Sequence, residues 1–185
     1  MFERRLLYIP VFHIDTNLIN ARQAIEAVNQ LETWCETGVI LLNMSYINRE
    51  ESMSGNSELR TRKANTYIYT IADEGNEPSH EGSIYRRFES IIFPRGVANQ
   101  NQHNDIAAMC EASKYNAIFV TNDGASRTQP GGILGNRNKF SDLLTVLTAD
   151  EAVAFVKRKI IERDNFNKEC ARITNTEPPE WTDQD

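Results

Sequence analysis

Apolar and polar residues follow one another along this chain in blocks typical of a strand, then a helix, then a strand. Residues 11–15 are rich in strand formers and end at Asp15, and the largely apolar run 38–45 suits a strand covered on both faces. Between them, apolar residues recur at helical spacing from residue 20 to residue 36, and Gly38 then provides a stop. This order predicts an α/β fold with a central, mainly parallel sheet.

The second half of the chain has the same alternation. Residues 105–114 predict a helix opened by Asp105, and the apolar residues 117–121 predict a central strand that leads to Asp123. Another strand is expected over residues 143–148, followed by a helix with an apolar stripe. These elements would extend the same parallel sheet.

The middle of the chain is less regular. A short helix is expected over residues 46–53, a strand or extended segment over 66–71, and a helix over 83–93. A second irregular stretch, the glycine-rich loop 124–139, follows the strand that leads to Asp123. These two stretches are where we expect features particular to this protein.

Length and composition fit one soluble domain. The chain has 185 residues, of which 40% are hydrophobic, so a real core is possible. No apolar run approaches the roughly 18 residues that span a bilayer, and the first residues do not resemble a signal peptide, so we expect a cytoplasmic protein with no membrane partner. The formal charge of −6 argues against non-specific nucleic-acid binding by bulk charge, yet permits a basic rim around an acidic site.

The cysteines and histidines argue against two kinds of site. No cysteines lie at the spacing of a zinc site, and no histidine has the sequence partners of a nucleophilic triad. Thiols in a reducing compartment are the simpler interpretation. The residues concerned are Cys35, Cys110, Cys170, His13, His80 and His103.

Acidic residues stand at the ends of predicted strands and beside them. Asp15 and Asp123 each follow a strand, Asp105 precedes the strand that leads to Asp123, and Glu50 or Glu51 lies shortly after the strand 38–45. Because parallel strands end at one edge of the sheet, acids from four segments are expected to converge there.

Each acid also has a simpler explanation. Asp15 could cap the helix that follows it, and Asp105 could cap the helix it opens and favour the helix dipole. Asp123 before Gly124 is a common turn pair. Only their joint occurrence favours a site.

Clustered carboxylates raise one another's pKa, and a divalent cation relieves that repulsion. Oxygen ligands without cysteine or a well-placed histidine favour Mg²⁺ or Mn²⁺ over Zn²⁺. Such ions activate water and stabilise the oxygens of a phosphodiester during its hydrolysis. The acids therefore predict hydrolysis of a nucleic-acid backbone.

Four segments resemble, in residues and in order, those of the PIN-domain nucleases: FHIDTNLI, GVILLNMS with a glutamate after it, NDIAAMCEASKYNAIFVTND and LLTVLTADEAVAFV. The resemblance covers roughly residues 5 to 158, discontinuously. It implies a Rossmann-like α/β/α sandwich and a Mg²⁺- or Mn²⁺-dependent ribonuclease in which Asp15, the glutamate, Asp105 and Asp123 hold the metal. Ile47 stands three residues before Glu50 at the family's apolar spacing, which favours Glu50 over Glu51 as the second acid.

The same resemblance suggests a domain plan. We expect one PIN-like domain over residues 1–172, an insertion at about 52–99, and an acidic, flexible tail over 173–185 that becomes ordered only on a partner. A second possibility is that the tail folds back over the basic helix residues that include Lys157 and Arg163, because opposite charges lie so close in the sequence.

Polar residues near the acids are candidates for supporting roles. Hydroxyls and amides beside Asp15 and Asp123 could orient carboxylates or waters, although turn bonding explains them almost as well. Basic residues of the loop 124–139 could contact RNA phosphates, or be ordinary solvated charges. The first group is Thr16, Asn17, Thr121 and Asn122, and the second is Arg127, Arg137 and Lys139.

The favoured function is a metal-dependent endoribonuclease, with single-stranded RNA as its substrate because separated strands can enter a narrow acidic crevice. The main alternative is a catalytically silent PIN-like module that binds RNA or protein. A phosphatase or nucleotide-binding domain is disfavoured because no DxD pair follows a predicted strand and no GxGxxG motif is present. The family resemblance adds an antitoxin-like inhibitor protein and a homodimer as possible partners, and it leaves toxin, defence and RNA-processing roles open.

Overall fold

The computed structural model describes residues 4–54, 57–69, 82–126 and 129–185. Within these ranges, five parallel strands form one sheet in the order β3-β2-β1-β4-β5. This confirms the predicted α/β fold with a parallel central sheet. The strands are β1 (Val11–Ile14), β2 (Leu41–Met44), β3 (Ile68–Tyr69), β4 (Ile118–Val120) and β5 (Val146–Leu147).

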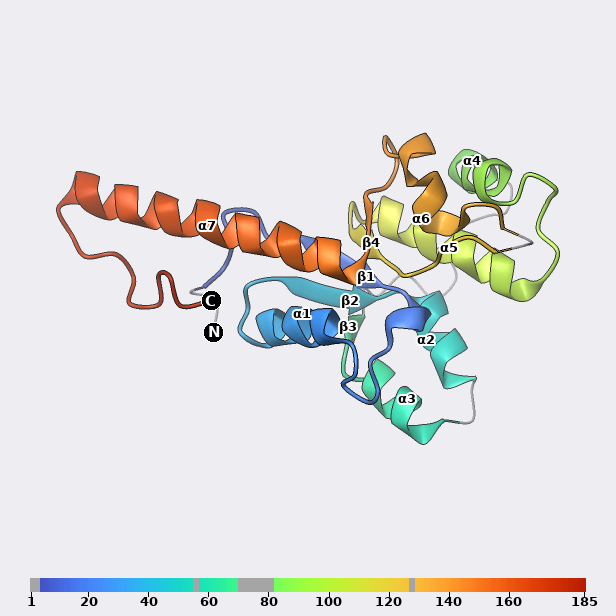
Figure 1. Cartoon of the computed structure of the whole chain (residues 1–185), viewed down its shortest axis with the longest axis horizontal. Helices are drawn as coiled ribbons and strands as arrows, with labels where there is room; N and C mark the ends of the chain where they lie inside the picture. The colour runs from blue at the N-terminus through green and yellow to red at the C-terminus, as the bar shows by residue number, and fades with distance from the viewer. Residues whose placement is uncertain (1–3, 55–56, 70–81, 127–128) are drawn as a thin grey trace.

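Helices cover both faces of the sheet (Figure 1). Phe12 and Ile14 belong to the core shared with α1 (Glu26–Glu36) and α7 (Ala149–Thr174), whereas Phe119 belongs to the core on the opposite face. Alternate strand residues therefore serve opposite cores, as the two-sided burial of a parallel sheet requires. The second core includes side chains of α4 (Ser83–Ile92), α5 (Gln100–Lys114) and α6 (Gly132–Asn136).

Shorter helices lie at the ends of the strands. The 3₁₀ turn η1 (Thr16–Leu18) follows β1, α2 (Tyr46–Met53) follows β2, and α3 (Glu58–Ala64) leads to β3. A second 3₁₀ turn, η2 (Arg137–Lys139), follows α6. The helix predicted over 46–53 is thus found with its predicted bounds.

Two helices begin elsewhere than the sequence predicts. α1 begins at Glu26 because the Asn20 side chain binds both backbone groups of Ile25 and holds the preceding residues in a loop. α5 begins at Gln100 after a cap by Asn99, so Asp105 lies inside the helix and does not open it.

The loop 124–139 contains a helix that the sequence prediction missed. Gly131 and Gly132 have φ angles of 84° and 59°, which favour glycine, and α6 starts directly there. A Cβ at Gly132 would collide with the carbonyl oxygen of Gly124. Gly132 therefore allows the chain to pass close to the segment that follows β4.

The acidic end of the chain packs back against α7 (Figure 1). The Arg163 side chain is 1% exposed, lies 2.8 Å from Asp185 and stands over the Trp181 ring at 4.7 Å. The backbone N–H of Asp183 donates to Asp164 at 3.1 Å. These contacts place the tail on Arg163, one of the basic helix residues over which the second possibility expected it to fold. Within the described ranges, no helix is both long enough and apolar enough to cross a bilayer.

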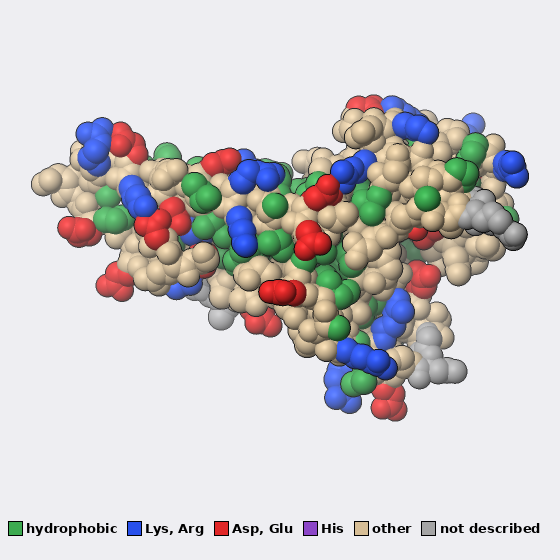
Figure 2. All heavy atoms as spheres, in the orientation of Figure 1, with side chains coloured by type: hydrophobic (Ala, Val, Ile, Leu, Met, Phe, Trp, Pro, Cys, Tyr) green, Lys and Arg blue, Asp and Glu red, His purple; other side chains and the backbone are tan. Residues whose placement is uncertain are grey.

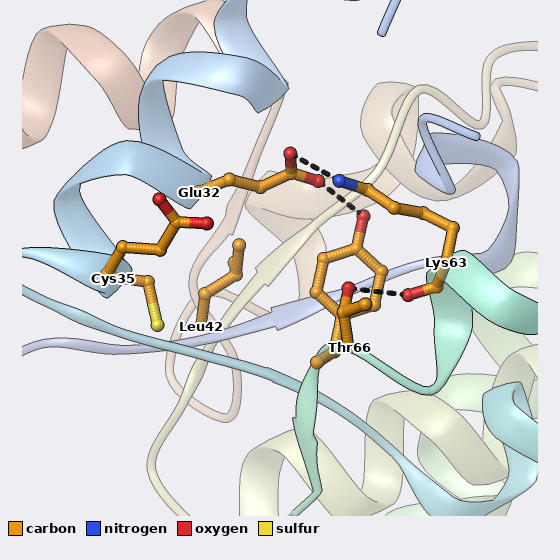
Figure 3. A pocket seen from close by; sticks show the side chains of 7 residues that line it. Glu32, Cys35, Leu42, Lys63 and Thr66 are labelled. Atoms are coloured by element: carbon orange, nitrogen blue, oxygen red, sulfur yellow. Dashed lines mark hydrogen bonds and ion pairs between the residues drawn. The ribbon is translucent and has the colours of Figure 1, made fainter. Parts of the chain in front are cut away.

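A small cavity of about 70 Å³ lies between α1, β2 and the segment that joins α3 to β3 (Figure 3). Lys63 and the Tyr67 hydroxyl both bind the Glu32 carboxylate, at 2.6 and 2.8 Å. No candidate site residue lines this cavity. Its lining is Glu32, Cys35, Glu36, Leu42, Lys63, Thr66 and Tyr67.

Candidate functional site

Asp15 lies at the carboxyl end of β1, where its N–H donates to Val120 of β4 at 2.9 Å. Its carboxylate accepts hydrogen bonds from the Thr16 N–H at 2.6 Å, the Thr121 hydroxyl at 2.6 Å and the Asn17 amide at 2.9 Å. Burial raises the pKa of Asp15 to about 6 despite these bonds, and the charges of Glu51 and Asp123 raise it further. The Thr16 bond is a local cap, while the bonds from Asn17 and Thr121 fix the carboxylate between β1 and β4.

Asp123 follows β4 and is held in place by α6. The Thr121 hydroxyl accepts from the Asp123 N–H at 2.9 Å, and the Ile133 N–H donates to the Asp123 carboxylate at 3.0 Å. The Leu134 N–H donates to the Asp123 carbonyl at 3.1 Å. The missed helix thus positions this acid from its first turn.

Asp105 projects from the second turn of α5, where capping cannot explain it. Burial raises its pKa to about 7, and the charges of Asp15, Asp123 and Glu51 add to the rise. Among the described residues, none donates a hydrogen bond to its carboxylate. Asp105 is thus a poorly hydrated carboxyl within reach of the charges of the other three acids.

The two adjacent glutamates of α2 point in different directions. The Glu51 carboxylate accepts from the Thr16 hydroxyl at 3.3 Å, which joins it to the segment that carries Asp15. The Glu50 side chain is 51% exposed and pairs with Arg49 at 3.2 Å. Successive helix residues lie about 100° apart around the axis, so only one of the two can face the other acids. The geometry favours Glu51 over Glu50 as the candidate second acid.

The donor set fits a hard divalent cation in its chemistry. It consists of carboxylates, and no cation is among the groups that shift the pKa of Asp15 or Asp105. In the part of the chain that the structure describes, no three Asp, Glu, His or Cys side chains stand close enough to hold a metal ion as they are placed. The acids are therefore near enough to repel one another and more widely spaced than a closed coordination shell.

The neighbouring polar residues contribute to different degrees. Thr16, Asn17 and Thr121 contact Asp15 directly, and Asn17 also donates to the Thr121 hydroxyl at 3.0 Å. Asn122 takes part through its backbone N–H, which donates to the Asn17 side chain at 3.3 Å. These contacts link the ends of β1 and β4 at the base of the acidic cluster.

Two of the basic residues of the loop 124–139 lie in the described part of the chain, and both contact other protein groups. Arg137 forms two hydrogen bonds with Glu151, at 2.5 and 2.9 Å, and lowers the pKa of that carboxyl to about 2. Lys139 donates to Asn136 at 2.8 Å. Arg127 lies outside the described residues.

The sequence analysis did not single out two charged residues: Arg60, which contacts the segment that carries Asp15, and the buried Glu111. Arg60 of α3 donates from Nη2 to the Thr16 carbonyl at 2.8 Å, and no motif marks it in the sequence. Glu111 is 5% exposed, accepts from the Tyr46 N–H at 3.4 Å, and has a pKa raised to about 7 by burial. Glu111 directly follows Cys110 in a largely apolar part of α5, and a carboxylate in such a place was the signal that could have marked it in the sequence.

No protein-family model matches the chain, and no curated protein matches it in sequence. Among solved structures, it is similar to the crystal structure of VapBC2 from Rickettsia felis bound to a DNA fragment from their promoter. That match has 17% sequence identity and a TM-score of 0.45, and it covers 75% of this chain and 98% of the other. A likeness at this level assigns no activity.

Proposed function

We propose that this protein is a PIN-type nuclease that hydrolyses phosphodiester bonds of single-stranded RNA with Mg²⁺ or Mn²⁺. The observation that carries the proposal is the meeting of four acids from four chain segments, of which Asp15 and Asp105 have pKa values raised by burial and by the other acids. Uncompensated negative charge at the carboxyl edge of a parallel sheet is unfavourable unless a cation binds there. The sequence resemblance to PIN-domain nucleases supports the same activity.

The residues that would hold the metal are Asp15, Glu51, Asp105 and Asp123. When bound, a divalent cation lowers the pKa of water and stabilises charge on phosphodiester oxygens. The hydrogen bonds from Asn17 and Thr121 keep the Asp15 carboxylate oriented toward the cluster. The contact between Thr16 and Glu51 holds α2 against the same edge.

The partners follow from the same proposal. Single-stranded RNA suits a site between strand ends and short helices better than a duplex, because separated strands can enter it. The resemblance to PIN-domain nucleases adds an inhibitor protein of antitoxin type and a second copy of the chain. The proposed chemistry is the same whether the protein acts as a toxin, as a defence enzyme or in RNA processing.

A cleavage assay tests the activity. End-labelled single-stranded RNA, duplex RNA and single-stranded DNA are incubated with the protein in Mn²⁺ or Mg²⁺, with and without EDTA. We expect cleavage of single-stranded RNA that EDTA abolishes and that Asp15→Asn lowers at least about 100-fold, in the range typical for loss of an electrostatic catalytic group. Cleavage that persists in EDTA or in this variant would contradict the proposal.

One observation favours a second function, a silent module that binds RNA or protein without chemistry: the described acids do not stand in a closed coordination shell. A cation that binds the folded protein stabilises it by about 2.7 kcal/mol at a hundredfold excess over its Kd. A clear rise in Tm with Mn²⁺ would therefore support the nuclease, and the lack of any rise would support the silent module.

A further inference from the structure

Arg60 lies beside the candidate site and forms no ion pair with an acid of the described part of the chain. It belongs to α3, in the insertion between β2 and α4, and its Nη2 donates to the Thr16 carbonyl at 2.8 Å. The Thr16 backbone N–H contacts Asp15, and its hydroxyl contacts Glu51. One backbone contact thus fixes the guanidinium next to the residue that touches two of the acids.

Arg60 uses little of its hydrogen-bonding capacity on the part of the chain that the structure describes. Among the described residues, no carboxylate lies within ion-pair distance of it, and its buried Nε has no hydrogen-bond partner. An arginine offers five N–H donors in a planar fork, and the Thr16 carbonyl takes only one of them. A buried donor without a partner is unfavourable, so an incoming anion would satisfy both the charge and the donor.

The other cations of α3 behave differently. Lys63 pairs with Glu32 at 2.6 Å on the side of the small cavity (Figure 3). Arg62 is exposed. Figure 2 shows Lys and Arg side chains over the end of the molecule where Figure 1 places α3. Arg60 alone of the three is held against η1.

We propose that Arg60 binds a phosphate of the RNA strand next to the one being cleaved, and so positions the strand on the acidic site. This inference rests on the proposed nuclease function and adds a binding residue to it. The contact that the structure gives Arg60 is with the Thr16 carbonyl and not with any of the four acids, so its charge remains for the substrate. A guanidinium fork matches two phosphate oxygens better than an ammonium group does.

Binding is measured first, apart from cleavage. The Asp105→Asn protein is mixed with labelled single-stranded RNA without metal, and Arg60→Gln, Arg60→Lys and Arg62→Gln are each added to that background. We expect Arg60→Gln to weaken binding about tenfold and to reduce the salt slope by about 0.7, the value for one phosphate contact on a single strand. Arg60→Lys should recover part of the affinity, and Arg62→Gln should change it less than about threefold.

Activity and folding then separate positioning from a structural role. In otherwise wild-type protein, Arg60→Gln should raise KM with little change in kcat and leave the Mn²⁺-induced rise in Tm intact. RNA affinity equal to that of Arg62→Gln would overturn the inference, as would a loss of the Mn²⁺ response. If Arg60→Gln weakens RNA binding while the wild-type protein never cleaves RNA, the phosphate contact stands and the nuclease function falls.

Discussion

Replacing Asp105 by asparagine is expected to stabilise the protein at pH 8 in EDTA, although the residue is proposed to serve the active site. The Asp105 pKa rises from 3.8 to about 7 in the folded state, because burial and three neighbouring acids oppose its ionisation. As the pH rises above 3.8, Asp105 loses its proton in the unfolded chain but keeps it in the folded protein. The free energy of unfolding therefore falls between about pH 4 and pH 7, where the folded protein also loses the proton. Asparagine removes that loss.

The pKa values set the size of the effect. A rise of about 3 pKa units corresponds to at most about 4 kcal/mol at 1.36 kcal/mol per unit. Because the Asp105 side chain is only partly buried, we expect about half of that, roughly 2 kcal/mol, after allowance for solvent screening. At pH 4, close to the unfolded-state pKa of 3.8, only a small part of this loss has developed, so the gain should fall to about 0.6 kcal/mol or less.

Urea denaturation at pH 4 and pH 8 in EDTA measures this difference, with Glu50→Gln as the control. Glu50 is exposed, so its substitution should change stability by less than about 0.5 kcal/mol at either pH. With excess Mn²⁺ the wild type should become more stable than Asp105→Asn, because only the wild type keeps all four acids that would bind the ion. An Asp105→Asn protein that is less stable than the wild type at pH 8 in EDTA would refute the electrostatic reasoning.

Three further outcomes are expected. Glu111→Gln should raise the free energy of unfolding by about 2–3 kcal/mol at pH 8 and by almost nothing at pH 4, because burial raises the Glu111 pKa from 4.5 to about 7; urea titrations at the two pH values measure it. Gly132→Ala should lower the free energy of unfolding by at least about 3 kcal/mol and weaken the Mn²⁺-induced rise in Tm, because its Cβ would collide with the backbone. Gly135→Ala is the control and should not destabilise the protein, because there is open space around Gly135. Trp181→Ala should lower stability by about 1 kcal/mol in thermal unfolding through loss of the contact with Arg163, and an unchanged Tm would mean that the tail does not pack there.

The sheet was predictable because its strands are locally marked. The runs that became β1, β2 and β4 are apolar and short, and a strand buried on both faces leaves that pattern in the sequence. The placement of Asp15 and Asp123 at strand ends follows from the same pattern. Their convergence required only that the strands be parallel and adjacent, as they are.

The details of the site depend on contacts that the sequence does not display. Both Asn99 and Asp105 are residues that can start a helix, and the sequence does not show that Asn99 caps α5. Spacing alone does not show whether Glu50 or Glu51 faces the other acids, because the orientation of α2 is not visible in the sequence. α6 was missed because its glycines resemble a loop and gain a helix only through close approach to β4. Arg60 was missed because its contact with Thr16 joins residues 44 positions apart.

The comparison of Glu51→Gln with Glu50→Gln in Mn²⁺-dependent cleavage of single-stranded RNA tests the central claim most directly. The two variants differ only in which of two adjacent glutamates loses its charge, and only Glu51 contacts the segment that carries Asp15. We expect Glu51→Gln to lower kcat/KM at least about 100-fold and Glu50→Gln to leave it within about threefold of the wild type. Equal activity of the two variants, or a larger loss in Glu50→Gln, would contradict a nuclease site built from Asp15, Glu51, Asp105 and Asp123.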